Sequence, residues 1–280
     1  MQIVHSIDKF RDKCSSLSHS LGLVPTMGAI HDGHLALIKQ AYLENESVVA
    51  TIFVNPKQFS ENEDFNDYPR PIESDLKSLE NENVDLVFVP STNEIYPSDH
   101  STHVTVGKIA EILEGKSRPN HFQGVSTIVT KLISVSRPDN TYFGQKDAQQ
   151  CAIVRKINRE LNLGTNIRIV PTVREKDGLA ISSRNIYLNK KERSASTVLF
   201  KSLEKGRRLK GNGPTEIDAL ITCIRESIVS EPLAEIDYIS VVDPNTLNNF
   251  SGPTDQSKQL LALVAVKIGN IRLIDNMIYD

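Results

Sequence analysis

Two histidines lie three residues apart in the segment 25–34, PTMGAIHDGH, where a short apolar run gives way to a helical pattern. The segment is therefore predicted to be the turn between a strand and a helix. Gly28 lets the backbone approach an anion closely, and the start of the following helix is expected to offer unpaired N–H groups and a partial positive charge from the helix dipole. His31 and His34 would share one face of the first turn. These features predict a site for a nucleotide's phosphates, in which each imidazole donates a hydrogen bond to a phosphate oxygen.

Two other interpretations of the histidine pair stay open at this point. One is a metal site, but zinc needs three or four ligands, and the sequence has neither closely paired cysteines nor an HExxH motif. The other is an ordinary surface turn, because many turns between a strand and a helix contain Gly, His and Asp without a function. The ten residues alone do not separate these interpretations.

Polar clusters of a similar kind follow three other predicted strands. They are NPKQF at 55–59, GQKDAQQ at 144–150 and REKDGLAISSRN at 174–185. In an open parallel sheet, ligands bind beyond the carboxyl ends of the strands. Any one cluster is compatible with a solvated loop, but four at equivalent strand ends favour a common site for a phosphate and a small polar substrate.

The elements that must position these clusters are predicted from alternating apolar and amphipathic segments. Strands are predicted over 22–25, 48–54, 84–89, 141–143 and 167–173, and helices over 33–44, 71–82, 124–135 and 148–161. Strands that alternate with helices are typical of a parallel sheet with right-handed crossovers. The predicted fold class is α/β: a Rossmann-like parallel sheet with helices on both faces, followed by a smaller α+β domain.

The pattern changes after residue 186. One long helix is predicted over 190–209 and another over 215–230, on either side of the turn-forming GNGP at 211–214. Strands are predicted over 236–242, 260–267 and 271–274, and the Gly-Asn pair at 269–270 is typical of a tight hairpin. Two domains are therefore expected: 1–178, which would bind the nucleotide and the substrate, and 179–280, an α+β cap.

Composition argues against several classes of protein. The 280 residues are 39% hydrophobic and 24% charged, which is typical of a globular protein. The net charge of −3 provides no basic field for nucleic acid, and no apolar run is long enough to span a membrane. The three cysteines are widely spaced, which favours a reducing, cytoplasmic location over a disulfide framework. Cys151 lies near a polar cluster, but a nucleophilic thiol needs a base beside it, which spacing in a sequence does not reveal, and the thiol is expected to be buried or incidental.

Six segments together resemble one family. In chain order they are PTMGAIHDGH, TIFVNPKQF, DYPR, HFQGVSTIVTKL, YFGQKD and DGLAISSRN, and they are similar to the signature segments of the pantoate–beta-alanine ligases. The histidine segment alone would indicate only the wider group of nucleotidyltransferases and class I aminoacyl-tRNA synthetases. The resemblance implies a cytoplasmic homodimer that condenses (R)-pantoate with β-alanine. Pantothenate, AMP and diphosphate would be formed from ATP through a pantoyl-adenylate.

The resemblance also implies roles for individual residues. His34 would be the proton donor, with His31, Lys146 and Arg184 as further catalytic residues. Gln58 would contact pantoate and the β-alanine position, and Gln150 would contact pantoate. The implied ATP-binding residues are Met27, Gly28, Ala29, Ile30, His31, Asp32, Gly33, His34, Gly144, Gln145, Lys146, Asp147, Val173 (by its backbone), Ile181, Ser182, Ser183 and Arg184.

Adenylation of a carboxylate needs residues of these types. The carboxylate attacks the α-phosphorus while diphosphate leaves, so the enzyme must hold the attack in line and balance negative charge. Lys146, Arg184 and the two histidines carry donors for that charge. The glutamines are neutral and would bind pantoate without an ion pair that weakens its nucleophilicity. Mg²⁺ is expected to come with ATP, because it bridges phosphate oxygens and keeps much of its water shell, and no residue is assigned as a metal ligand.

The sequence also departs from the family pattern. Gln145 stands where an acidic residue is common, Ala148 where an aromatic residue is common, and Asn120 where glycine is frequent. Asn is expected to be tolerated there, because it adopts the left-handed conformation more readily than most residues. Two rival functions are a nucleotidyltransferase that releases only pyrophosphate and a regulatory module that binds ATP without turnover.

Overall fold

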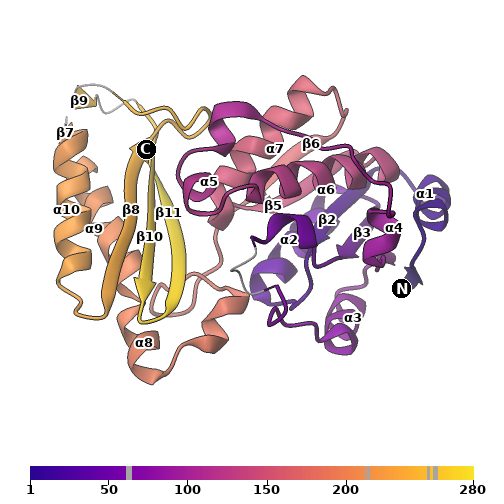
Figure 1. The fold of residues 1–280 in the computed structure, drawn as a ribbon, viewed down its shortest axis with the longest axis horizontal. Coiled ribbons are helices and arrows are strands. Elements are labelled where there is room, and N and C mark those ends of the chain that lie inside the picture. The colour runs from indigo at the N-terminus through magenta and orange to yellow at the C-terminus, as the bar shows by residue number, and fades with distance from the viewer. Residues whose placement is uncertain (61–64, 212, 214, 251–252, 255–257) are drawn as a thin grey trace. The chain divides into compact units, whose positions relative to one another are not determined.

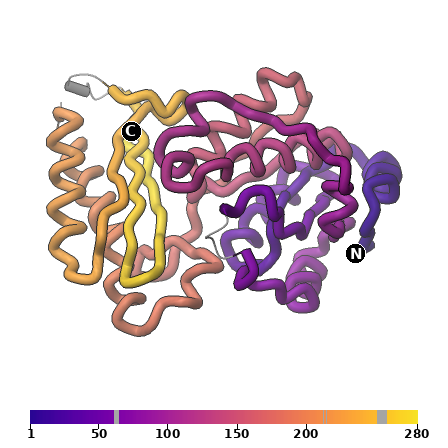
Figure 2. The backbone as a smooth tube through the Cα atoms, viewed as in Figure 1, coloured from indigo at the N-terminus to yellow at the C-terminus, as the bar shows by residue number. Residues whose placement is uncertain are grey.

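The computed structural model of the chain describes residues 1–60, 65–211, 213, 215–250, 253–254 and 258–280. Contacts between residues divide the chain into two units, whose elements are labelled in Figure 1 and whose backbone is traced in Figure 2. Unit 1 comprises Met1–Gly144 and Gln149–Pro171, and unit 2 comprises Gln145–Ala148 and Thr172–Asp280. The short segment Gln145–Ala148 therefore belongs to unit 2, although unit 1 residues flank it in the sequence.

Unit 1 is built on a six-stranded parallel sheet with the order β1-β4-β3-β2-β5-β6. Its strands are β1 (Gln2–Val4), β2 (Leu21–Thr26), β3 (Ser47–Ile52), β4 (Leu86–Phe88), β5 (Asn140–Gly144) and β6 (Asn166–Val170). The chain order reverses at β2, because β3 and β4 extend the sheet on one side of it and β5 and β6 on the other. In sheets of this kind ligands bind beyond the carboxyl ends at the reversal, which here falls between β2 and β5.

Successive residues of the central strands point to opposite faces, and each face carries its own apolar cluster. Leu23 and Val49 belong to one cluster, whereas Val24 and Ala50 belong to the other. The first cluster includes residues of α1 (Ile7–Ser16), α6 (His121–Ser136) and α7 (Ala148–Glu160), and the second includes residues of α2 (Asp32–Glu44) and α3 (Ile72–Asn81). The predicted parallel sheet with helices on both faces is confirmed.

Each strand predicted for this part of the chain is found, with its bounds shifted by at most a few residues. The sequence prediction did not include β1 and α1 at the N-terminus. It also did not include the short helices α4 (Thr92–Ile95) and α5 (Glu114–Ser117) or the 3-10 helices η1 (Pro56–Gln58) and η2 (Gly107–Ala110). Elements of three or four residues are too short for the spacing of their apolar residues to reveal a helix or a strand.

Unit 2 contains a three-stranded antiparallel sheet with the order β11-β10-β8. Its strands are β8 (Ala234–Val242), β10 (Leu260–Ile268) and β11 (Ile271–Tyr279), and a separate pair joins β7 (Thr215–Glu216) to β9 (Pro253–Thr254). The helices α9 (Val198–Gly211) and α10 (Ile217–Val229) pack on one another, and both contribute to the apolar cluster of this sheet (Figure 1). Gly269, with φ of +58°, turns the chain between β10 and β11, so the predicted hairpin is confirmed.

Two predicted elements of unit 2 were wrong in extent. The long helix over 190–209 is interrupted, so that α8 (Lys190–Ala195) precedes α9. At the interruption the hydroxyls of Ser196 and Thr197 donate to the carbonyls of Arg193 and Ser194, and such bonds compete with helix continuation. The strand predicted over 271–274 continues to Tyr279. Residues 212 and 214 of the predicted GNGP turn lie outside the described residues.

Among the helices formed by the described residues, none has both the length and the apolar character needed to cross a membrane.

Candidate active site

The turn after β2 carries both histidines at the beginning of α2. Gly28 has φ of +81° and Ala29 has φ of +50°, so the backbone reverses sharply before the helix. His31 is the N-cap residue, and its Nδ1 accepts a hydrogen bond from Gly33 N–H at 3.1 Å. The Nδ1 of His34 accepts from His31 N–H at 3.4 Å. The two rings stack with centroids 4.0 Å apart, which confirms that the histidines share one face of the first turn.

These capping bonds determine which ring nitrogen carries the proton. A neutral imidazole has one N–H and one acceptor nitrogen, and Nδ1 of both His31 and His34 is the acceptor here. The proton of each neutral ring is therefore on Nε2, which makes Nε2–H the group that would donate to a ligand.

A buried carboxylate holds the turn from the side of α3. Asp75 is 2% exposed, and its two oxygens accept hydrogen bonds of 2.8 Å from the N–H groups of Ala29 and Ile30. A Cβ added at Gly28 would lie 2.8 Å from Asp75 Oδ2, so glycine is required at this position. The expectation of unpaired N–H groups at the start of the helix was wrong for Gly33, whose N–H donates to His31 Nδ1. The N–H groups of Ala29 and Ile30, just before the helix, are bound by Asp75.

Gln58, at the end of η1, lies beside the same turn. Its Nε2 donates to Met27 Sδ, and its Oε1 accepts from Asn55 Nδ2 at 3.0 Å. Asn55 is oriented in turn by Tyr96, whose hydroxyl donates to Asn55 Oδ1 at 2.9 Å. The predicted clusters at 25–34 and 55–59 therefore meet, and the amide of Gln58 has a defined orientation.

Helix α6 packs closely on η1. A Cβ added at Gly124 would lie 2.2 Å from the Lys57 carbonyl oxygen, so the helix and η1 approach as closely as glycine allows. The side chain of Asn55 also donates to Gly124 O at 3.1 Å. Asn120, the residue before α6, has φ of +66°, so the expectation that Asn would accept the left-handed conformation is confirmed.

The remaining predicted residues of unit 1 lie at the end of β5 and the start of α7. Gly144 is the last residue of β5, and Gln150 is partly buried in the first turn of α7. Cys151 is 3% exposed, and its Sγ donates to the carbonyl of Gly144 at 3.3 Å. This contact gives the thiol a structural role near the carboxyl end of β5.

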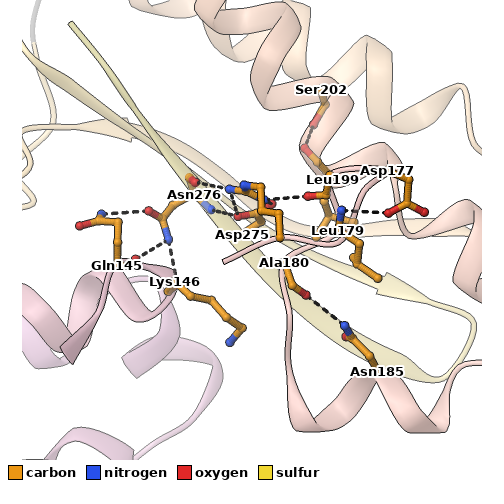
Figure 3. Close-up of polar contacts among 12 residues, drawn as sticks. Gln145, Lys146, Asp177, Leu179, Ala180, Asn185, Leu199, Ser202, Asp275 and Asn276 are labelled. Atoms are coloured by element: carbon orange, nitrogen blue, oxygen red, sulfur yellow. Dashed lines mark hydrogen bonds and ion pairs between the residues drawn. The ribbon is translucent and has the colours of Figure 1, made fainter. Parts of the chain in front are cut away.

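In unit 2, the segment that contains Lys146 is bound to strand β11 (Figure 3). The Nδ2 of Asn276 donates to the carbonyls of Gln145 and Lys146 at 2.9 and 2.8 Å, and its Oδ1 accepts from Gln145 Nε2 at 3.0 Å. The segment forms the 3-10 helix η3 (Gln145–Asp147), in which Lys146 Nζ lies 3.3 Å from Asp147 Oδ1. The backbone from which Lys146 projects is thus fixed by one side chain of β11.

A buried ion pair attaches the segment after β6 to the same strand. The guanidinium of Arg174 donates to Asp275 Oδ2 and Oδ1 at 2.6 and 2.9 Å and also donates to the carbonyls of Gly178 and Asn276. Its Cζ lies 4.7 Å from the centroid of the Phe200 ring. Asp275 is 3% exposed; burial raises the pKa of its carboxyl, and the hydrogen bonds from Arg174 oppose that shift. Removing Arg174 would leave a buried carboxylate without its cation.

The predicted residues beyond Arg174 follow a narrow reversal of the chain. The N–H of Ile181 donates to the carbonyl of Val173 at 3.0 Å. Ser182 is the N-cap of η4 (Ser183–Tyr187), and its Oγ accepts from Arg184 N–H at 3.3 Å. Arg184 is therefore in the first turn of a short helix, with its backbone held by Ser182.

Sequence reasoning did not identify Asp75, Tyr96, Asp275 and Asn276. Each forms contacts with residues that are distant in the sequence, so spacing alone does not reveal them. One signal was present: Asp275 and Asn276 are polar residues within the apolar pattern of a strand, and the predicted strand ended before them. Buried polar residues of this kind need partners, which points to a structural or functional contact.

Across the parts of the chain that the structure describes, no group of three or more His, Cys, Asp or Glu residues is arranged to hold a metal ion.

Comparisons with known proteins give one consistent result. A family model described as pantoate-beta-alanine ligase matches residues 2–278. A pantothenate synthetase of Roseiflexus castenholzii is 47% identical over 280 residues, 100% of each chain, and one of Carboxydothermus hydrogenoformans is 50% identical over 264 residues, 93% of this chain and 91% of that one.

Comparison with solved structures indicates the same family as the sequence comparisons. The pantothenate synthetase of Thermus thermophilus has a TM-score of 0.93 at 40% identity and covers 99% of both chains. The pantoate-beta-alanine ligase of Francisella tularensis, complexed with beta-gamma ATP and beta-alanine, has a TM-score of 0.81 at 34% identity and covers 100% of this chain and 98% of that one. With residues 2–278 matched and with relatives of this similarity over the whole length, the chain belongs to the pantoate-beta-alanine ligase family.

Proposed function

We propose that the chain joins (R)-pantoate to β-alanine in two steps through a pantoyl-adenylate. Its family membership makes it an ATP-dependent ligase of these two substrates. In the first step a pantoate carboxylate oxygen forms a bond to the α-phosphorus of ATP, and the bond to diphosphate breaks. In the second, the amine of β-alanine attacks the acyl carbon, loses a proton and displaces AMP.

The stacked histidines are the observation that carries this proposal. Their Nδ1 atoms accept backbone N–H groups, so their Nε2 atoms carry the N–H groups that would donate to phosphate oxygens. Donors fixed before the reaction stabilise the charge that develops on departing diphosphate, because they need no reorganisation. His34 acts as the proton donor to the leaving group, with His31 and the other residues of 27–34 binding ATP.

Gln58 and Gln150 are the residues proposed to bind pantoate, and Gln58 also contacts the β-alanine position. The bond from Asn55 Nδ2 to Gln58 Oε1 supports this role, because it engages the amide oxygen and assigns the donor role toward pantoate to the Gln58 N–H groups. A neutral donor holds the pantoate carboxylate without an ion pair, so its nucleophilicity is retained.

Residues of the second unit are proposed to bind ATP as well. Lys146 and Arg184 would supply positive charge. The other residues proposed to bind ATP are Gly144 of the first unit and Gln145, Asp147, Val173 (by its backbone), Ile181, Ser182 and Ser183. The partly buried Lys146 side chain, 23% exposed, supports this role because charge interactions strengthen as water is excluded.

We also propose that Mg²⁺ accompanies ATP, and that the enzyme is a cytoplasmic homodimer. The lack of a metal cluster among the described residues fits an ion held mainly by phosphate oxygens and water. The structure describes all three cysteines and joins none of them in a disulfide, which fits a reducing compartment. Light scattering of the purified chain measures the oligomeric state, and a monomer at micromolar concentration would contradict the dimer.

Release of AMP in the presence and absence of β-alanine tests the two-step reaction. The ligase releases AMP and forms pantothenate only when pantoate, ATP and β-alanine are all present. A nucleotidyltransferase would release pyrophosphate alone and would not respond to β-alanine. A regulatory module would bind ATP and release neither product.

Replacing Gln58 by Ala tests the pantoate contact. The KM for pantoate is expected to rise about five- to tenfold, because roughly 1 kcal/mol of hydrogen bonding is lost, while the KM for ATP changes much less. Gln259→Ala removes the same side chain from an exposed position of unit 2 and serves as the matched control. An equal rise in both KM values would contradict the assignment.

A further inference from the structure

Two adjacent residues of β11 bind both segments of unit 2 that are proposed to hold ATP (Figure 3). Asn276 binds the segment that contains Lys146, and Asp275 binds Arg174, which precedes the segment that contains Arg184. The β11 strand comes more than 120 residues after Lys146 in the sequence, so this connection is a property of the fold. The family resemblance seen in the sequence implied no role for Asp275 or Asn276.

Asn276 is suited to positioning because each atom of its amide has a defined partner. It donates to two main-chain carbonyls and accepts from the Gln145 side chain, and it is only 3% exposed. Reversing the amide would set its oxygen against the two carbonyl oxygens. The side chain therefore holds the backbone at 145–146 in one orientation, and with it the direction in which Lys146 leaves the chain.

Asp275 fixes the backbone of the segment that leads to Arg184, and it does so through the side chain of Arg174. The carboxylate fixes the guanidinium with two hydrogen bonds, and the guanidinium in turn holds the carbonyl of Gly178. Arg174 and Ala180 form an antiparallel bridge, after which the chain enters Ile181–Arg184. Arg174 also donates to the main-chain carbonyl of Asn276, so the two sets of contacts share this residue.

We infer that Asp275 and Asn276 are positioning residues for ATP, which fix the Lys146 and Arg184 segments relative to one another on strand β11. This inference rests on the proposed roles of Lys146 and Arg184. It differs from a role in general stability, because general stability would affect all three substrates alike.

Asn276→Asp and Asn276→Ala test the inference together. The first keeps the shape of the side chain and replaces its two donors by an acceptor, and the second removes the contacts without adding charge. Both are expected to raise the KM for ATP about tenfold or more, as expected when several hydrogen bonds to a segment are lost. The KM for pantoate is expected to change less than about twofold.

Matched controls separate positioning from charge and from folding. Asn270→Asp adds the same charge at the exposed hairpin turn next to β11, and it should leave the KM for ATP unchanged. Asp237→Asn removes an ion pair with Arg272 in the same sheet, and it should also leave the KM for ATP unchanged. If the Asn276 variants do not fold, Gln145→Ala removes one of the three contacts, and a two- to fivefold rise in the KM for ATP is expected, on the order of one lost hydrogen bond.

Calorimetric titration of ATP into wild type and variants measures ATP binding without turnover. It therefore tests the positioning role of Asp275 and Asn276 separately from the proposed ligase reaction. Weaker ATP binding in folded Asn276 variants supports the inference, even if wild type makes no pantothenate and the proposed function fails. Unchanged ATP affinity and KM in folded variants would overturn it, and so would an equal rise in the KM values of all three substrates.

Discussion

At the scale of single residues, the histidine pair is fixed by its own helix cap. The N–H groups of Gly33 and His31 are bound by the two Nδ1 atoms, so the rings are oriented before any ligand arrives. Asp75 holds the preceding turn by its two bonds to main-chain N–H groups. Orientation that exists before binding lowers the reorganisation needed in the reaction, which is the physical advantage of this arrangement.

Replacing His34 by Ala is expected to lower the rate of adenylation by about two to four orders of magnitude, the range typical of a positioned proton donor or charge-stabilising group. The rate is measured as pantothenate formed per enzyme at saturating substrates. His103→Ala, at an exposed histidine outside the turn, should retain the wild-type rate. Near-normal turnover of the His34 variant would remove the role assigned to it.

At the scale of elements, close packing of α6 on η1 positions Gln58. Gly124 allows the approach, and the ring of His121, in the first turn of α6, forms a hydrogen bond of 2.7 Å between its Nδ1 and the carbonyl of Gln58. The pantoate contact therefore depends on a helix that begins more than sixty residues after Gln58.

Gly124→Ala tests this packing. The added methyl group must displace the Lys57 carbonyl, and overpacking typically costs about 1 to 3 kcal/mol of unfolding free energy. The shift of η1 should also raise the KM for pantoate more than the KM for ATP. Gly211→Ala, where a Cβ meets nothing within 4 Å, is the matched control. Wild-type stability in the Gly124 variant, measured by urea unfolding, would contradict the close approach.

The sequence predicted the strands of the parallel sheet and the four polar clusters at their ends, because these depend on local periodicity and on residue type. Contacts such as Asp75 with Ala29 or Asn276 with Lys146 depend on which elements the fold brings together, and no local pattern encodes them. The predicted strand over 271–274 ended too early, because the polar residues Asp275 and Asn276 interrupt its apolar pattern as the end of a strand would. The break at Ser196 arises from side-chain bonds that propensity does not show.

At the scale of the whole molecule, the chain consists of a parallel α/β unit and a smaller antiparallel unit that includes Gln145–Ala148. Each unit carries its own apolar clusters and its own share of the proposed ligand-binding residues. The functional boundary at residue 178 stays a prediction. Strand β11 has a proposed role in ATP binding in addition to that of the turn at 25–34.

Stability of the chain is expected to fall below about pH 4. The N–H of Leu21 and the ring of His19 lower the pKa of Asp139, and Arg193 lowers the pKa of Asp177. Because the folded-state pKa values lie below the unfolded ones, these carboxylates stabilise the fold above the unfolded pKa, and that contribution is lost as pH falls through the folded pKa. Asp139→Asn should lower the melting temperature at about pH 7. Between about pH 7 and about pH 3 the melting temperature of this variant should fall less than that of wild type. An equal fall in melting temperature in the variant and in wild type between those pH values would contradict the stabilising role assigned to the Asp139 carboxylate.

Exchange of labelled pyrophosphate into ATP, measured with and without pantoate and in the absence of β-alanine, tests the central claim most directly. The pantoyl-adenylate mechanism predicts rapid exchange that requires pantoate, because only the reversible first step runs. Exchange without pantoate, or no exchange when pantoate is present, would contradict it.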